Sequence, residues 1–155
     1  MKRIVGLVVV LFVILAGCKK DNYDAGKQLA EEEILIKEFL ATNNINAKRD
    51  TSGVYYVISN PGSGNVNYTS NTNVRVKYKL RLLNGKEIPQ TTEPINFTLG
   101  SVIAGWQIGI PKIQPGGKIR LIIPSVWAYG RQAQSGIPAN SVLDFDVELL
   151  GIITN

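Results

Sequence analysis

Histidine is absent from this chain of 155 residues, and cysteine occurs once, at Cys18. The absence of histidine excludes Ser-His-Asp and Cys-His nucleophilic sites, His-ligated zinc and the usual general base near neutral pH. One cysteine cannot form an internal disulfide bond or a Cys-x-x-Cys motif. We therefore expect no metal and no cofactor, and any catalysis has to proceed without an activated nucleophile.

Signals for phosphate and nucleic-acid binding are also missing. The segment Gly116-Gly117-Lys118 lacks the upstream glycine and the following hydroxyl residue of a Walker-type loop. The net charge is +5, and it becomes +3, with 15 basic and 12 acidic residues, once a leader that carries Lys2 and Arg3 is removed. Because this charge is small and no basic run is interleaved with aromatic residues, we expect no nucleic-acid partner.

The N-terminal segment has the pattern of a secretory signal. A basic start precedes an apolar run from Ile4 to Leu15, which is too short to cross a bilayer because a spanning helix needs about 20 residues. The run ends in Leu15-Ala16-Gly17-Cys18, which resembles the bacterial lipobox. This resemblance implies removal of residues 1–17 and acylation of Cys18, and therefore a lipid-anchored protein of the bacterial cell envelope, facing the periplasm or the surface. A plain secretory signal with a chance cysteine, or an N-terminal anchor helix, would also fit these residues.

A tether and one helix are predicted next. Residues 18–26 are polar without an apolar period, which is typical of a flexible tether. From about Lys27 to Thr42, acidic residues gather early, as the helix dipole favours, and apolar residues recur on one face. These apolar residues are Leu29, Ala30, Ile34, Ile36, Leu40 and Ala41. We expect this helix and its linker, residues 27–52, to pack on their own domain in a monomer; a dimer formed through the helix is the alternative.

From Gly53 onward the apolar residues recur with a period of two. This pattern predicts strands at residues 54–59, 74–82, 95–99, 118–123 and 142–150, and one short helix at 103–110. Asn84-Gly85 favours a hairpin turn. Asp144, Asp146 and Glu148 alternate along the last strand, so we expect them on an outward, solvated face. Residues 53–155 are therefore predicted to form one α+β domain with an antiparallel sheet.

Short motifs with matching order and spacing cover about residues 54–151. They are Tyr78, Asn84-Gly85-Lys86, Pro94 to Gly100, Val102 to Trp106, Trp127 to Gly130, Gly136 to Ser141 and Phe145 to Leu150. Together they resemble the FKBP family of peptidyl-prolyl cis/trans isomerases. The resemblance implies a five-stranded antiparallel sheet curled around a short helix, here with an N-terminal helical extension. The family's strand order also places the strand at 74–82 beside the strand at 142–150, and the outward faces of these two strands carry opposite charge.

The resemblance also implies the residues of a prolyl-binding pocket. Trp106 would form its floor, and the Tyr129 hydroxyl and the Ile103 backbone N–H would hold substrate carbonyls. The remaining substrate-binding residues would be Tyr78, Ile88, Ile95, Val102, Ile137 and Phe145. Such a pocket would rotate X-Pro bonds in proline-containing polypeptides and assist the folding of exported proteins. The reaction breaks no covalent bond, which agrees with the absence of histidine.

Two positions depart from the family pattern. Ile88-Pro89 stands where the family has Phe-Asp after the Gly-Lys turn, and Ile95 stands where an aromatic residue follows the proline. In the family the aspartate contributes polar contacts beside the twisting amide, whereas Pro89 can supply neither a charge nor a backbone donor. We therefore expect an apolar pocket with weakened catalysis. A prolyl-binding or chaperone module without catalysis, and a purely structural lipoprotein, are the alternatives.

Overall fold

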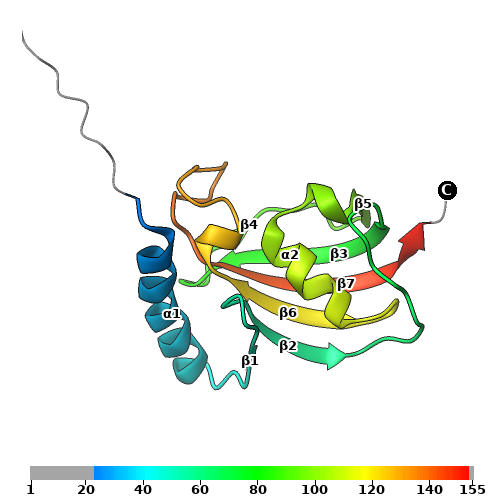
Figure 1. The fold of residues 1–155 in the computed structure, drawn as a ribbon, viewed down its shortest axis with the longest axis horizontal. Helices are drawn as coiled ribbons and strands as arrows, with labels where there is room; N and C mark the ends of the chain where they lie inside the picture. Colours follow the sequence, from blue (N-terminus) through cyan, green and yellow to red (C-terminus); the bar gives the residue numbers. More distant parts are fainter. Residues whose placement is uncertain (1–22, 154–155) are drawn as a thin grey trace, which may run out of the picture.

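The computed structural model describes residues 23–153 as an antiparallel sheet that packs against two helices (Figure 1). The helices are α1 Ala25–Thr42 and α2 Ala104–Gly109, with short 3-10 turns η1 Leu99–Ser101, η2 Ile110–Lys112 and η3 Ser125–Trp127. The strands are β1 Lys48–Arg49, β2 Tyr55–Asn60, β3 Asn73–Leu82, β4 Glu87–Ile88, β5 Ile95–Thr98, β6 Lys118–Ile123 and β7 Leu143–Ile153. The predicted leader at 1–17 and Cys18 lie outside the described residues.

The sheet has seven strands in the order β1-β2-β6-β7-β3-β4, with β5 also paired to β3. Every pair is antiparallel. The five longer strands are those that the sequence predicts, and the two-residue strands β1 and β4 are additions at the two ends of the strand order. The α+β architecture and the antiparallel sheet are therefore confirmed.

Strands β3 and β7 pair along their whole length, with Lys77 opposite Glu148 and Lys79 opposite Asp146. This is the neighbour relation that the family resemblance implies, and opposite charges on facing residues contribute roughly 0.2 to 1 kcal/mol per pair. A bulge between Arg75 and Val76 shifts the register near the end of the pairing. The central position of β7, between β6 and β3, places Phe145 in the middle of the sheet.

Asp144 does not lie on a solvated surface, as the alternation along β7 had predicted; its side chain is buried, with 1% of its surface exposed. The Arg81 Nε atom lies 3.0 Å from Asp144 Oδ2, and the Arg120 Nε atom lies 2.8 Å from Oδ1. These arginines come from the two strands that flank β7, so the carboxylate joins three neighbouring strands. Asp146 is exposed as predicted, and Glu148 is half-buried.

One face of the sheet and helix α2 enclose the main hydrophobic core. The inward residues of β6, Ile119, Leu121 and Ile123, belong to this core. A Cβ atom at Gly105 or Gly109 of α2 would overlap the Ile123 or Leu121 side chain. These two glycines therefore allow the short helix to lie directly on the sheet, where Figure 1 shows it in front of β3, β7 and β6.

Helix α1 begins at Ala25, two residues before the predicted start, because Asp24 accepts hydrogen bonds from the Gly26 and Lys27 N–H groups at 2.9 and 3.1 Å. It ends at Thr42, before Asn43, as predicted. None of the helices in residues 23–153 is long and apolar enough to cross a membrane.

The buried stripe of α1 differs from the predicted one. It consists of Glu32, Ile36 and Leu40, spaced by four residues, whereas Ile34 is 68% exposed. Ile36 and Leu40 pack with Tyr55, Ile122 and Val142 in a second hydrophobic cluster. Because Ile122 alternates with the inward residues Leu121 and Ile123, this cluster lies on the face of the sheet opposite α2. The helix thus packs on its own domain, as expected.

Candidate active site

Four aromatic side chains from four different elements meet beside α2. Trp106 of α2 is 3% exposed, and its ring is surrounded by those of Tyr78 on β3, Phe97 on β5 and Phe145 on β7. The ring centroids lie 5.1, 5.7 and 5.4 Å from Trp106, at interplanar angles of 89°, 86° and 78°. Such edge-to-face contacts are the arrangement that aromatic pairs favour. Trp106 therefore has a fixed orientation at the base of the cluster.

Strand register explains why these rings meet. On β3, Tyr78 alternates with exposed Lys77 and Lys79 and so faces the core. Its neighbour Leu80 pairs with Phe145, and Val74 pairs with Phe97. Phe97 was absent from the predicted site, although its position two residues after Ile95 already placed both side chains on one face.

The Trp106 indole N–H is a buried donor that has no acceptor among the described residues. An unsatisfied buried donor costs about 1–3 kcal/mol, and such groups are uncommon enough in folded proteins to require an explanation. A packed core position normally avoids this cost. The observation sets Trp106 apart from the apolar core residues around it.

Two hydrogen-bonding groups lie at the edge of the cluster. Ile103 precedes α2, where its carbonyl accepts a hydrogen bond from the backbone N–H of Trp106 at 2.9 Å. Its own N–H donates to no group in residues 23–153. Tyr129 follows η3, and 37% of its side chain is exposed. The Ile103 N–H is therefore available to a ligand, and the partly exposed Tyr129 lies close enough to Tyr78 to affect its pKa.

The Tyr78 hydroxyl donates to the Gln90 Oε1 atom at 2.5 Å. Burial, with a smaller contribution from nearby Tyr129, raises the pKa of Tyr78, so its hydroxyl keeps its proton at neutral pH. Gln90 directly follows Pro89, which is exposed. Pro89 stands at the position where the family pattern has its aspartate. The sequence offered no signal for this contact, because a loop glutamine is usually solvated.

The other predicted pocket residues are buried to different degrees. Ile88 and Ile137 are 7% and 5% exposed and belong to the same core, and Val102 is partly buried against it. Ile95 is half-buried at the start of β5, opposite Val76. The structure therefore brings Tyr78, Val102, Ile103, Trp106, Ile137 and Phe145 into or onto one core, with Ile88 beside them.

A hollow of about 960 Å³ lies elsewhere, over the charged residues of the sheet. Its lining includes Lys77, Arg120 and Glu148, and it touches Tyr78, Ile88 and Gln90 but not Trp106. Part of this charge is internally neutralised, since Lys118 and Glu148 form an ion pair at 3.4 Å. We place the candidate site at the aromatic cluster because the unpaired donors and the tightly oriented rings converge there.

Comparison with known proteins identifies the relatives of this fold. Residues 64–150 match the family model described as FKBP-type peptidyl-prolyl cis-trans isomerase. The FKBP-type peptidyl-prolyl cis-trans isomerase FkpA of Escherichia coli is 40% identical over 135 residues, which cover 85% of this chain and 47% of that protein.

Solved structures agree with the sequence comparison. The crystal structure of Escherichia coli FkpA matches with a TM-score of 0.70 at 38% identity, covering 82% of this chain and 62% of that one. A peptidyl-prolyl cis-trans isomerase of Pseudomonas syringae matches with a TM-score of 0.68 at 31% identity, covering 86% of this chain and 98% of that one. The chain spans about half the length of the curated relatives it matches.

Proposed function

Because the chain belongs to the FKBP-type peptidyl-prolyl cis-trans isomerase family, we propose that it rotates X-Pro bonds in proline-containing polypeptides and so assists their folding. The observation that carries this proposal is the aromatic cluster around Trp106, with available donors at Ile103 and Tyr129. A proline ring is apolar and its flanking carbonyls are acceptors, so this combination fits an X-Pro segment.

The proposed mechanism follows from the electronic change in the amide. A planar amide has its charge spread over oxygen and nitrogen, and rotation against a barrier of about 18–20 kcal/mol removes that resonance. The twisted amide is less polar than the planar one, so a dry, apolar surface favours it relative to water. Trp106 supports the prolyl ring, while the Ile103 N–H and the Tyr129 hydroxyl hold the carbonyls on either side of the rotating bond.

The Gln90 contact bears on the predicted weakness of catalysis. Pro89 cannot orient the Tyr78 hydroxyl, but the neighbouring Gln90 amide accepts its hydrogen bond. A neutral acceptor thus takes the place of a carboxylate at the edge of the site. We propose that the chain catalyses rotation with a polar orienting group that the family motif does not contain.

We further propose an envelope location for the protein. The Leu-Ala-Gly-Cys segment before an apolar run supports cleavage before Cys18, acylation of that residue and a membrane anchor. The predicted tether at residues 18–26 is shortened, because α1 begins at Ala25. Residues 18–24 would then form the tether, 25–52 the helical extension and 53–155 the isomerase domain. The packing of α1 on its own sheet supports a monomer.

The deciding experiment is an NMR exchange measurement of isomerisation in a short X-Pro peptide. It compares residues 19–155 with the Tyr129→Phe variant, which loses one hydroxyl. We expect a wild-type rate above the uncatalysed one, and about a two- to tenfold loss of kcat/KM in the variant, because a net hydrogen bond is worth about 0.5–1.5 kcal/mol.

Tyr23→Phe is the matched control. Tyr23 is 39% exposed, as Tyr129 is 37% exposed, and Tyr23→Phe keeps the ring over which the Arg131 guanidinium lies. Its replacement should leave the rate unchanged. Peptide binding without any acceleration of exchange by the wild-type chain would reject catalysis and leave a prolyl-binding module.

A further inference from the structure

Helix α1 carries a buried carboxylate that the proposed mechanism does not use. Glu32 is 2% exposed, and its oxygens accept hydrogen bonds from the Ser125 N–H at 2.7 Å and the Ser125 hydroxyl at 2.5 Å. The Gln28 side chain donates a third bond at 2.8 Å. A buried carboxylate is costly unless it is hydrogen-bonded, and here both oxygens accept hydrogen bonds. The partner segment lies 93 residues further along the chain.

Ser125 begins the turn that carries Tyr129. Its carbonyl accepts the Ala128 N–H at 2.9 Å and the Gly130 N–H at 2.8 Å. The residues on both sides of Tyr129 are therefore bonded to the backbone of Ser125. The Gly130 carbonyl in turn accepts the Asn140 N–H at 2.7 Å, which ties the turn to the segment after Ile137.

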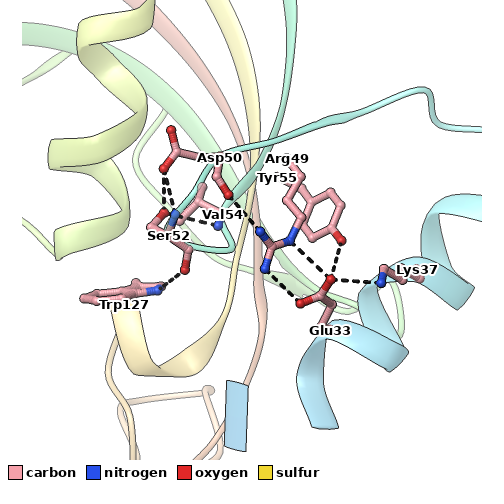
Figure 2. Close-up of polar contacts among 8 residues, drawn as sticks. All are labelled: Glu33, Lys37, Arg49, Asp50, Ser52, Val54, Tyr55 and Trp127. Atoms are coloured by element: carbon pink, nitrogen blue, oxygen red, sulfur yellow. Dashed lines mark hydrogen bonds and ion pairs between the residues drawn. The ribbon is translucent and has the colours of Figure 1, made fainter. Parts of the chain in front are cut away.

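The same turn has a second attachment that leads back to α1, as Figure 2 shows. The Trp127 Nε1–H donates to the Ser52 carbonyl at 2.9 Å. Ser52 is held by the Asp50 carboxylate, which accepts its hydroxyl at 2.9 Å and also pairs with Lys112 at 2.6 Å.

The final step of this second attachment is an ion pair on α1. Arg49, next to Asp50, lies 2.9 Å from the Glu33 carboxylate, and the Tyr55 hydroxyl donates to Glu33 at 3.3 Å (Figure 2). Glu32 thus contacts Ser125, at the start of the turn, directly. The adjacent Glu33 is connected to Trp127 of the same turn through the segment from Arg49 to Ser52. The direct contact through Glu32 is the shorter one and is fully buried.

We propose that Glu32 is a positioning residue of the isomerase site, acting through Ser125 on Tyr129, so that α1 is part of the catalytic unit. This inference rests on the proposed function and deepens it. The matching family model begins at residue 64, beyond α1, so membership of the family assigns no role to this helix. Glu32 occupies a position that would continue the apolar stripe of Ile36 and Leu40. Its hydrogen bonds with Ser125 explain why a charged side chain is buried there.

The test compares Glu32→Ala and Glu32→Gln with Ile36→Val in residues 19–155. Ile36 is fully buried on the same helix but packs in the second hydrophobic cluster, without a hydrogen bond to the turn. At a temperature where all variants are folded, we expect about a two- to tenfold loss of kcat/KM for Glu32→Ala, no larger than that of Tyr129→Phe. Glu32→Gln keeps one acceptor oxygen and should recover part of the rate, and Ile36→Val should match the wild type.

A double-mutant cycle with Tyr129→Phe separates positioning from general stability. If Glu32 acts through Tyr129, Glu32→Ala should cause little further loss in the Tyr129→Phe background. The indole N–H signal of Trp127 provides a second readout, which should shift in Glu32→Ala and stay in place in Ile36→Val.

The possible failures are distinguishable. A wild-type chain without isomerase activity would reject the proposed function itself. An active wild type with a folded Glu32→Ala variant of equal kcat/KM would overturn only the present inference, as would full additivity with Tyr129→Phe. If Glu32→Ala does not fold, the same comparisons apply to Glu32→Gln and to Ser125→Ala, which removes only the hydroxyl contact.

Discussion

At the Tyr78 hydroxyl, a loop glutamine supplies the hydrogen-bond acceptor. Its acceptor, the Gln90 Oε1 atom, fixes the direction of the hydroxyl hydrogen at the edge of the aromatic cluster. The oxygen lone pairs of Tyr78 then face away from Gln90. A side-chain amide also carries N–H donors, which a carboxylate lacks. The partner of the Tyr78 hydroxyl is therefore an uncharged group.

The contribution of Gln90 can be measured by Gln90→Ala. Loss of one net hydrogen bond of about 0.5–1.5 kcal/mol should lower kcat/KM by about two- to tenfold, with little change in stability because the loop is exposed. The measurement is the same peptide exchange experiment. Thr92→Ala, in the same exposed loop, is the control and should keep the wild-type rate. Equal rates for the two variants would show that the Tyr78 hydroxyl needs no acceptor.

Among the secondary-structure elements, three strands meet at one buried carboxylate. Asp144 of β7 accepts hydrogen bonds from Arg81 of β3 and from two nitrogens of Arg120 on β6, at 2.8–3.0 Å. The Asp144 contact also raises the pKa of the Arg120 guanidinium, which stays charged in any case. Removing the central charge leaves Arg120 without its carboxylate partner and leaves Arg81 with only the exposed Asp146.

We therefore expect Asp144→Asn to lower the free energy of unfolding by about 3–5 kcal/mol, the cost of breaking a buried ion pair by removing one partner. Urea unfolding at neutral pH measures this change. Asp146→Asn is the control, since Asp146 also contacts Arg81 but its side chain is 49% exposed; its loss should stay below about 1 kcal/mol. A similar loss in the two variants would contradict the role of Asp144 as the centre of the network.

The attachment of α1 depends on the charge of a second glutamate. Hydrogen bonds from Lys37 and Arg49 lower the pKa of Glu33 from 4.5 to about 2. A carboxylate whose pKa is lowered by folding stabilises the folded state above its ordinary pKa, and this stabilisation is lost as the pH falls through the folded-state value. The contribution of Glu33 is thus complete above about pH 4.5 and disappears toward pH 2.

Glu33→Gln should lower the free energy of unfolding by about 0.2–1 kcal/mol at pH 7, as for a partly exposed ion pair. The difference from the wild type should shrink below pH 4.5 and vanish near pH 2. Denaturant titrations at several pH values measure it. Glu31→Gln is the control, because Glu31 lies 3.8 Å from Lys27 and both side chains are largely exposed. Its difference from the wild type should be small at every pH. A Glu33 effect that persists undiminished at pH 2 would contradict the assignment.

At the scale of the whole molecule, two packing layers are joined through one sheet. Helix α2 and the aromatic cluster lie on one face, and α1 lies on the other with Ile36 and Leu40 against Ile122. The polar contacts from α1 to η3 run from the outer layer to the turn that carries Tyr129. The two faces are therefore not independent, and the helical extension belongs to the same packed unit as the sheet.

The proposed membrane anchor makes a prediction about the intact protein, although Cys18 lies outside the described residues. Mass spectrometry of protein isolated from bacterial membranes should find Cys18 at the N-terminus, carrying acyl chains. A Cys18→Ala variant should lose the membrane association, because each buried CH₂ group contributes about 0.8 kcal/mol to it. Unmodified Cys18, or a chain that still begins at Met1, would reject the lipid anchor.

The sequence alone predicted the five longer strands, the two helices and their order, but not β1 and β4, because alternating and helical apolar periods are local properties of the chain. The resemblance of its ordered motifs to the FKBP family further implied that Trp106, Tyr78 and Phe145 belong to one pocket. The tertiary structure alone decided the burial of Glu32 and Asp144 and the exposure of Ile34. The apolar period of a segment does not identify hydrogen-bond partners such as Ser125 or Arg120, which lie far along the chain. The hydrogen bonds of these partners lower the cost of burying a carboxylate. The same reason explains Gln90, whose acceptor role exists only where the loop meets Tyr78.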